Sequence, residues 1–160
     1  MNTDASGSIP EDALDSMVSL ALILAADGNN SLAGLRMLDD AFSGDGMLEY
    51  ALNCVDRGHV ARLESPSGRR IFTVASTLSR KNALTFDVAS SGIRDGGYYL
   101  CVAGSCTCIE YITRLVVTGR QFQRYCCKHA LAVRIAELTG KFISRRISDH
   151  ELARVLDSVS

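Results

Sequence analysis

This sequence lacks the motifs on which most enzymes depend. It contains no glycine-rich phosphate loop, no serine or cysteine nucleophile motif and no pair of carboxylates spaced for acid–base catalysis. The turn Ser43-Gly44-Asp45-Gly46 lacks the ligand ladder and terminal glutamate of a calcium loop. We therefore predict that the chain is not an enzyme and that this turn binds no calcium.

Long apolar runs are also scarce. The longest run, residues 17–26, is interrupted by Ser19 and is too short to cross a bilayer. Residues 1–7 are polar and lack the basic and apolar regions of a secretory signal. Six cysteines would suggest disulfides in a secreted protein. Because no such signal is present, we expect reduced thiols inside the cell and no contact with a membrane.

The composition is that of a globular chain. Its 160 residues suit one domain, and 47% apolar residues suffice for a core of ordinary size. The charge is unevenly distributed. Residues 1–56 hold ten acidic residues and one basic residue, whereas residues 109–147 hold eight basic and two acidic residues. The two ends either attract each other or face partners of opposite sign.

The first third of the sequence predicts helices. Apolar residues recur at helical spacing in residues 10–26, 31–42 and 47–55, with capping serines before the first two segments. Cys54, in the third helix, is predicted to be a buried small hydrophobe.

Alternating residues then indicate strands. Residues 60–64 and 69–75 flank Ser65-Pro66-Ser67-Gly68 and predict a hairpin, with the exposed Arg69 and Arg70 beside its turn. Further strands are predicted at residues 84–89 and 98–103, with loops at 76–83 and 90–97. In the last strand Tyr99 and Cys101 share one face, and we assign Cys101 to the core.

Two cysteine-containing pairs stand out in the second half. Cys106 and Cys108 are one residue apart, and Cys127 and His129 repeat this spacing nineteen positions later. Three thiols and an imidazole form a complete tetrahedral ligand set for Zn²⁺, which prefers sulfur and nitrogen donors. Because such a site leaves no position for a reactive water, the predicted zinc would fold the chain rather than catalyse a reaction.

The second pair opens a predicted helix. Leu131, Ile135 and Leu138 recur at helical spacing, which places Cys127 and His129 in the first turn, where the helix dipole favours a thiolate. The neighbouring Cys126 competes with Cys127 as the third ligand.

The remaining elements are helical. Residues 109–117 predict a helix, Gly140 is a candidate C-cap, and Ser148-Asp149-His150-Glu151 is a capping box that opens a last helix. His59 and His150 have no partners in sequence and are predicted to be surface or cap residues.

These elements define an α+β fold with N-terminal helices, a small antiparallel β-sheet and a ββα zinc finger. The predicted regions are a flexible tail (1–8), a helical region (9–57), the hairpin and finger (58–140) and a C-terminal helix (141–160).

Cys-x-Cys followed by Cys-x-His at a helix start resembles the SWIM zinc finger, and residues 127–133, Cys-Lys-His-Ala-Leu-Ala-Val, match its most typical stretch. Residues 55–57 and 63–74 resemble the segment that precedes the finger in Shu-complex SWIM proteins. The resemblance favours Cys127 over Cys126 because the spacing is then Cys-x-His. The position after Cys108 is Ile109, where many relatives have proline, and residues 76–97 resemble an insertion.

The resemblance implies a function in the nucleus. It implies a Shu-complex subunit that pairs with a RecA-like recombinase paralogue and promotes recombinase filament assembly on single-stranded DNA during homologous recombination. A SWIM module that binds DNA directly is the alternative, although the basic run is expected to lack interleaved exposed aromatics beyond Phe122 and Tyr125. A ubiquitin-ligase adaptor is a weaker third interpretation, because the sequence offers no second domain for it.

Overall fold

We analysed a computed structural model of the chain, which describes residues 46–76, 97–102, 105–118 and 127–157, and the single positions 16, 19 and 36. The predicted tail 1–8, strand 84–89, most of both predicted loops and Cys126 lie outside these residues. So do the predicted helices 10–26 and 31–42, apart from the three single positions.

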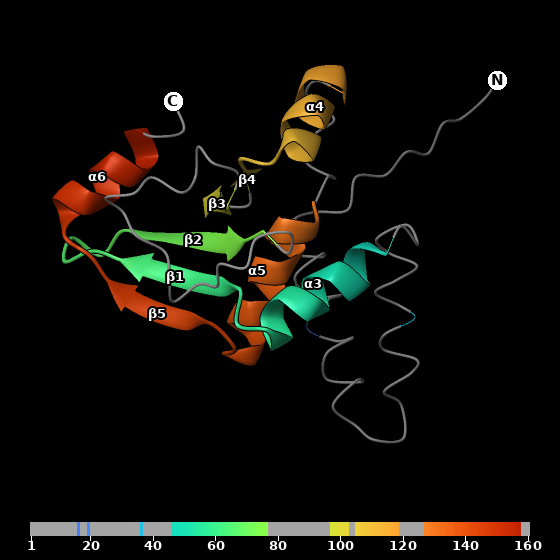
Figure 1. The fold of residues 1–160 in the computed structure, drawn as a ribbon, viewed down its shortest axis with the longest axis horizontal. Coiled ribbons are helices and arrows are strands. Elements are labelled where there is room, and N and C mark those ends of the chain that lie inside the picture. The colour runs from blue at the N-terminus through green and yellow to red at the C-terminus, as the bar shows by residue number, and fades with distance from the viewer. Residues whose placement is uncertain are drawn as a thin grey trace.

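A five-stranded sheet forms the centre of the described structure, with strand order β4-β3-β2-β1-β5 (Figure 1). Its strands are β1 (Val60–Glu64), β2 (Arg70–Ala75), β3 (Tyr98–Val102), β4 (Ser105–Cys106) and β5 (Ile143–Arg146). The helices are α3 (Met47–Asp56), α4 (Ile109–Thr118), α5 (Lys128–Thr139) and α6 (Asp149–Asp157). The predicted α+β fold is therefore confirmed.

Each strand sends alternate side chains to opposite faces of the sheet, as the period of two requires. On β3, Tyr99 and Cys101 face one core, whereas Tyr98 and Leu100 face the other. This alternation matches the prediction for the strand. The sheet is thus buried on both faces, which is possible because helices cover both.

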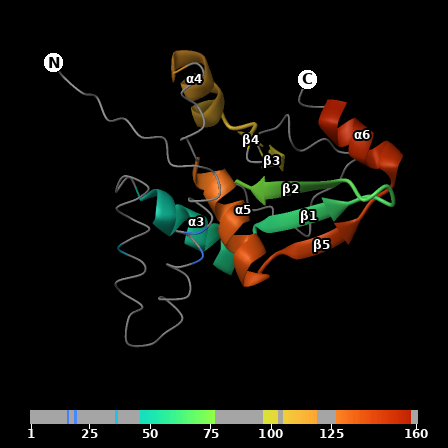
Figure 2. The same cartoon turned by 180° about the vertical axis from the view of Figure 1, so that it is seen from behind.

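Different helices cover the two faces. We call the face that bears the cysteines the thiol face; α5 lies against it, and α3 packs on α5. Leu152 and Val155 of α6 share the core of the other face with Leu63 and Leu100, and Figures 1 and 2 show α6 at the end of the sheet away from α3 and α5. We call this second face the aliphatic face.

The predicted hairpin forms between β1 and β2, which pair antiparallel. Its turn is closed by hydrogen bonds from the Ser65 N–H to the Arg69 carbonyl and from the Gly68 N–H to the Ser65 carbonyl. Gly68 has a φ of 80°, a conformation that glycine adopts without steric cost. Arg69 and Arg70 are exposed beside it, as predicted.

The structure adds a strand that the sequence analysis did not predict. β5 lies within the region expected to be only a C-terminal helix, and it pairs parallel with β1, so that the sheet is mixed. Gly140 ends α5 with a φ of 67° and turns the chain toward this strand, confirming the predicted C-cap. After β5, the Ser148 N–H donates to the Glu151 carboxylate and the Glu151 N–H donates to Ser148 Oγ, which confirms the capping box of α6.

One leucine of the apolar period of α5 is not in the core: Leu138 is 48% exposed, since Ala136 is the last buried residue of the helix. Of the two positions predicted for His59, surface or cap, the structure supports the cap. Its N–H donates to the Cys54 carbonyl at the end of α3, and the residue is only 8% exposed. His150 is exposed, as predicted. None of the helices in the described part of the chain is long and apolar enough to cross a bilayer.

Candidate metal centre

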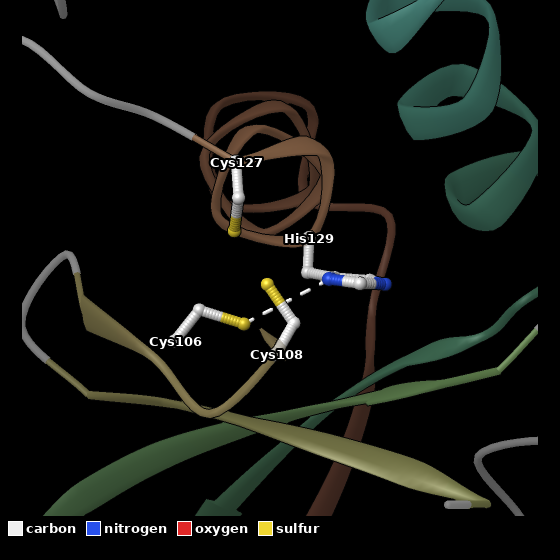
Figure 3. A group of neighbouring side chains, drawn as sticks. All are labelled: Cys106, Cys108, Cys127 and His129. Atoms are coloured by element: carbon white, nitrogen blue, oxygen red, sulfur yellow. Dashed lines mark hydrogen bonds between the residues drawn. The ribbon is translucent and has the colours of Figure 1, made fainter. Parts of the chain in front are cut away.

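Three elements of the thiol face bring the four predicted residues together. Cys106 ends β4, Cys108 immediately precedes α4, Cys127 caps α5, and His129 lies in the first turn of α5. All four side chains are buried, and their ligand atoms lie within 4.8 Å of one another. Figure 3 shows the three sulfur atoms and the His129 ring converging on one point.

The residue between the first two cysteines fixes their turn. The Thr107 N–H donates to the Leu100 carbonyl, and Thr107 Oγ1 accepts a hydrogen bond from the Leu100 N–H, both at 3.0 Å. Cys106 and Cys108 are thereby held on either side of a residue that is anchored to β3.

Two of the cysteines cap helices with their sulfur atoms. Cys108 Sγ accepts from the Tyr111 N–H at 3.3 Å, and Cys127 Sγ accepts from the Ala130 N–H at 3.4 Å. Each sulfur therefore satisfies an otherwise unpaired N–H at a helix start, where the dipole also favours negative charge. The predicted position of Cys127 at a helix N-terminus is confirmed.

The geometry fits a tetrahedral metal ion. Zinc–sulfur bonds of about 2.3 Å place ligand atoms about 3.8 Å apart in a tetrahedron. Cys106 Sγ and His129 Nδ1 are 3.8 Å apart, and all four ligand atoms lie within the 4.8 Å noted above. Because the set comprises three soft sulfurs and one imidazole nitrogen, it suits zinc better than magnesium or calcium.

Crowding of the thiols shifts their pKa values in opposite directions. The pKa of Cys108 is lowered because Cys106 and Cys127 donate hydrogen bonds to its sulfur, with the Tyr111 N–H adding to the effect. The pKa of Cys106 is raised by hydrogen bonding with Cys101 and Cys108, and that of Cys127 by hydrogen bonding with Cys106 and Cys108. A bound dication would replace the shared protons and allow all three sulfurs to ionise.

Two cysteines in the core stand outside the ligand set, as predicted. Cys54 is fully buried in α3, and burial raises the pKa of its thiol to about 11. Cys101 is buried beside Cys106, its partner across the β3–β4 pair.

Two tyrosines that the sequence analysis did not select surround the imidazole. Tyr99 stacks on the His129 ring with centroids 3.9 Å apart, and Tyr50 Oη lies 3.4 Å from His129 Nε2. Strand alternation places Tyr99 on the thiol face, but no local pattern links Tyr50 to a residue 79 positions away.

Comparison with known proteins supports the resemblance found in the sequence. Over 108 residues the chain is 28% identical to zinc finger SWIM domain-containing protein 7 of Mus musculus. The aligned region covers 66% of this chain and 58% of the mouse protein. The chain thus spans less than two thirds of that relative. No protein-family model and no solved structure matches it. The similarity confirms the resemblance to SWIM zinc-finger proteins.

Proposed function

We propose that this chain is a non-catalytic, zinc-binding subunit of a Shu-type complex in the nucleus. It would pair with a RecA-like recombinase paralogue and promote recombinase filament assembly during homologous recombination. Zn²⁺ would be held by Cys106, Cys108, Cys127 and His129 and would join β4, α4 and α5 into one rigid unit.

The observation that carries this proposal is the buried cluster of four zinc-type ligands that the described residues bring together at those three elements. A shell of four protein ligands holds the metal for structure, since a catalytic zinc keeps one position for water or substrate. The name of the mouse relative supports the zinc-finger assignment, and the two sequence blocks that resemble Shu-complex SWIM proteins support the recombination role.

The charge pattern is compatible with an adaptor. Lys141, after α5, pairs with Asp56 at the end of α3 at 3.7 Å, so one basic residue of the second half already faces the acidic first half. Both side chains are largely exposed, and such a pair contributes little stability. It does show that part of the basic charge is matched within the chain.

Co-purification tests the partner. The full chain, loaded with zinc, would be co-expressed with each RecA-like recombinase paralogue of the same organism. We expect one paralogue to co-elute with it in size-exclusion chromatography and to be lost with Cys108→Ser. A zinc-loaded chain that co-elutes with none of them would contradict the proposed partnership.

Direct DNA binding is the second candidate function. Arg69, Arg70 and Arg146 are exposed at the same end of the sheet, where Glu64 is the register partner of both Arg70 and Arg146. Glu64 forms an ion pair with Arg70 at 3.5 Å, which reduces the local positive charge. Contacts with phosphates would produce binding that weakens steeply with salt.

A titration of the zinc-loaded chain alone against labelled single-stranded and duplex DNA at several salt concentrations separates the two functions. Sub-micromolar binding that weakens steeply with salt and falls with Arg146→Gln would favour direct binding. Absence of binding by the chain alone would favour the adaptor, with DNA contacted through its partner.

A further inference from the structure

The surroundings of His129 distinguish its two ring nitrogens. Nδ1 faces the sulfur cluster, 3.8 Å from Cys106 Sγ, as Figure 3 shows. Nε2 points toward α3, where Tyr50 Oη lies 3.4 Å away. The ring is 2% exposed, so neither nitrogen can rely on bulk water for a partner.

The Tyr50 hydroxyl is oriented by a second contact. It also hydrogen bonds with the Cys54 side chain, one turn later on α3. A phenolic hydroxyl both donates and accepts, so Tyr50 can donate to Cys54 while its oxygen accepts a hydrogen bond from the Nε2–H of His129. The imidazole then carries its hydrogen on Nε2 and leaves the Nδ1 lone pair facing the sulfurs.

Two aromatic rings prevent the imidazole from turning. Tyr99 stacks on it at 3.9 Å and 27°, while Tyr50 meets it edge-on at 5.6 Å and 86°. Lys128 Nζ lies 4.7 Å from the centroid of the Tyr50 ring and covers it. Flipping the ring would place a carbon against Tyr50 Oη and forfeit the only hydrogen bond recorded for Nε2 within the described residues.

We infer that His129 binds the metal through Nδ1 and that Tyr50 and Tyr99 are positioning residues for it, Tyr50 by accepting the Nε2 proton and Tyr99 by stacking. The metal centre thereby extends beyond the finger to α3, which precedes the first ligand by 50 positions. Metal binding and the docking of α3 on α5 should then strengthen each other. This inference rests on the proposed zinc site but not on the proposed recombination partner.

The ligating nitrogen can be identified directly in the zinc-loaded full chain. Long-range ¹H–¹⁵N spectra distinguish a metal-bound Nδ1 from a metal-bound Nε2, and His129 is identified by the signals that disappear in His129→Ala. We expect a metal-bound Nδ1 and a protonated Nε2. Coordination through Nε2 would overturn the inference while leaving the zinc site intact.

Zinc affinity tests the two tyrosines. Tyr50→Phe keeps the ring but removes the acceptor, and we expect it to weaken zinc binding about tenfold or more in competition with a chromophoric chelator. Tyr99→Phe keeps the stacked ring and should leave the affinity unchanged, whereas Tyr99→Leu should weaken it. Tyr98→Phe, on the same strand but on the aliphatic face, is the matched control.

The outcomes separate this inference from the zinc site itself. Wild-type zinc affinity in both Tyr50→Phe and Tyr99→Leu would overturn the positioning roles. A wild-type chain that binds no zinc would instead overturn the proposed zinc site. Equal weakening in Tyr98→Phe would show a general packing effect and would also contradict the inference.

Discussion

The two faces of the sheet are stabilised in different ways. The thiol face buries Cys101, Cys106 and His129 with aromatic residues and two helices, whereas the aliphatic face is built from side chains such as Leu63, Leu100 and Leu152 under α6. Apolar burial stabilises the aliphatic face without a cofactor. Clustered thiols crowd their protons, so we propose that the thiol face, although its core is the larger of the two, needs a bound metal to reach its full stability. On this proposal, one short sheet combines a metal-dependent core with a metal-independent one.

Loss of a metal ligand should destabilise the thiol face far more than the aliphatic face. We expect Cys108→Ser or His129→Ala to lose zinc and unfold the thiol face from β4 to α5, since structural zinc contributes of order 10 kcal/mol to folding. Elemental analysis and circular dichroism would measure both effects.

Cys126→Ser serves as the control for the ligand assignment and should retain one zinc per chain. Zinc release by this variant would identify Cys126 as the third ligand instead of Cys127. Full zinc retention by both Cys108→Ser and His129→Ala would contradict the four-ligand site.

A cavity in the aliphatic face should destabilise the chain without affecting zinc stoichiometry. Leu152 is 2% exposed, and Leu152→Ala should cost about 2–5 kcal/mol, because it leaves a cavity between α6 and the sheet. Urea unfolding of the zinc-loaded protein measures this cost, with the exposed Leu138→Ala as a control expected to have little effect. Zinc loss in Leu152→Ala under native conditions would show that the two faces are not independent.

The cap of α6 should contribute a smaller amount to the aliphatic face. Ser148→Ala removes the side-chain acceptor of the Glu151 N–H and should cost about 1 kcal/mol, again with unchanged zinc content. The same hydrogen bonds with Ser148 lower the pKa of the Glu151 carboxyl in the folded state. The charged carboxyl therefore stabilises the fold at pH values above its unfolded pKa, and this contribution is lost as pH falls through the folded pKa. A variant as stable as wild type in thermal unfolding would contradict the contribution of the cap.

The smallest effect concerns His59, between α3 and β1. Burial, followed by the charge of Arg57, lowers the pKa of its imidazole, and Nδ1 has no hydrogen-bond partner within the described residues. Because the folded state favours the neutral ring, this contribution to stability is complete above pH of about 6.5 and is lost as pH falls through the folded pKa. His59→Gln should therefore have a shallower decline in stability below that pH than wild type. Parallel declines in pH-dependent urea unfolding would contradict this role.

The sequence predicted what depends on local spacing. Cys-x-Cys and Cys-x-His indicated the four clustered residues, and strand alternation assigned Tyr99 and Cys101 to one face. It could not predict contacts that the fold creates between distant segments. β5 is a four-residue strand with two arginines, and it pairs with β1, some 80 positions earlier, so neither length nor alternation distinguished it from a loop. The contact of Tyr50 with His129 is equally non-local.

The buried histidine and the exposed leucine have a similar explanation. His59 is buried because the connection from α3 to β1 is short: its N–H donates to the Cys54 carbonyl and its own carbonyl accepts from the Ala75 N–H. Leu138 matches the helical period of α5 but lies two positions beyond Ala136, the last buried residue of that helix. Periodicity predicts which face of an element is apolar, but the length of the neighbouring elements decides how much of that face is buried.

The most direct test of the metal-dependent thiol face is X-ray absorption spectroscopy at the zinc edge of the full chain, combined with elemental analysis. The account predicts one zinc per chain, with three sulfur ligands at about 2.3 Å and one nitrogen ligand at about 2.0 Å. A folded chain without bound zinc, or a zinc shell dominated by oxygen, would contradict it.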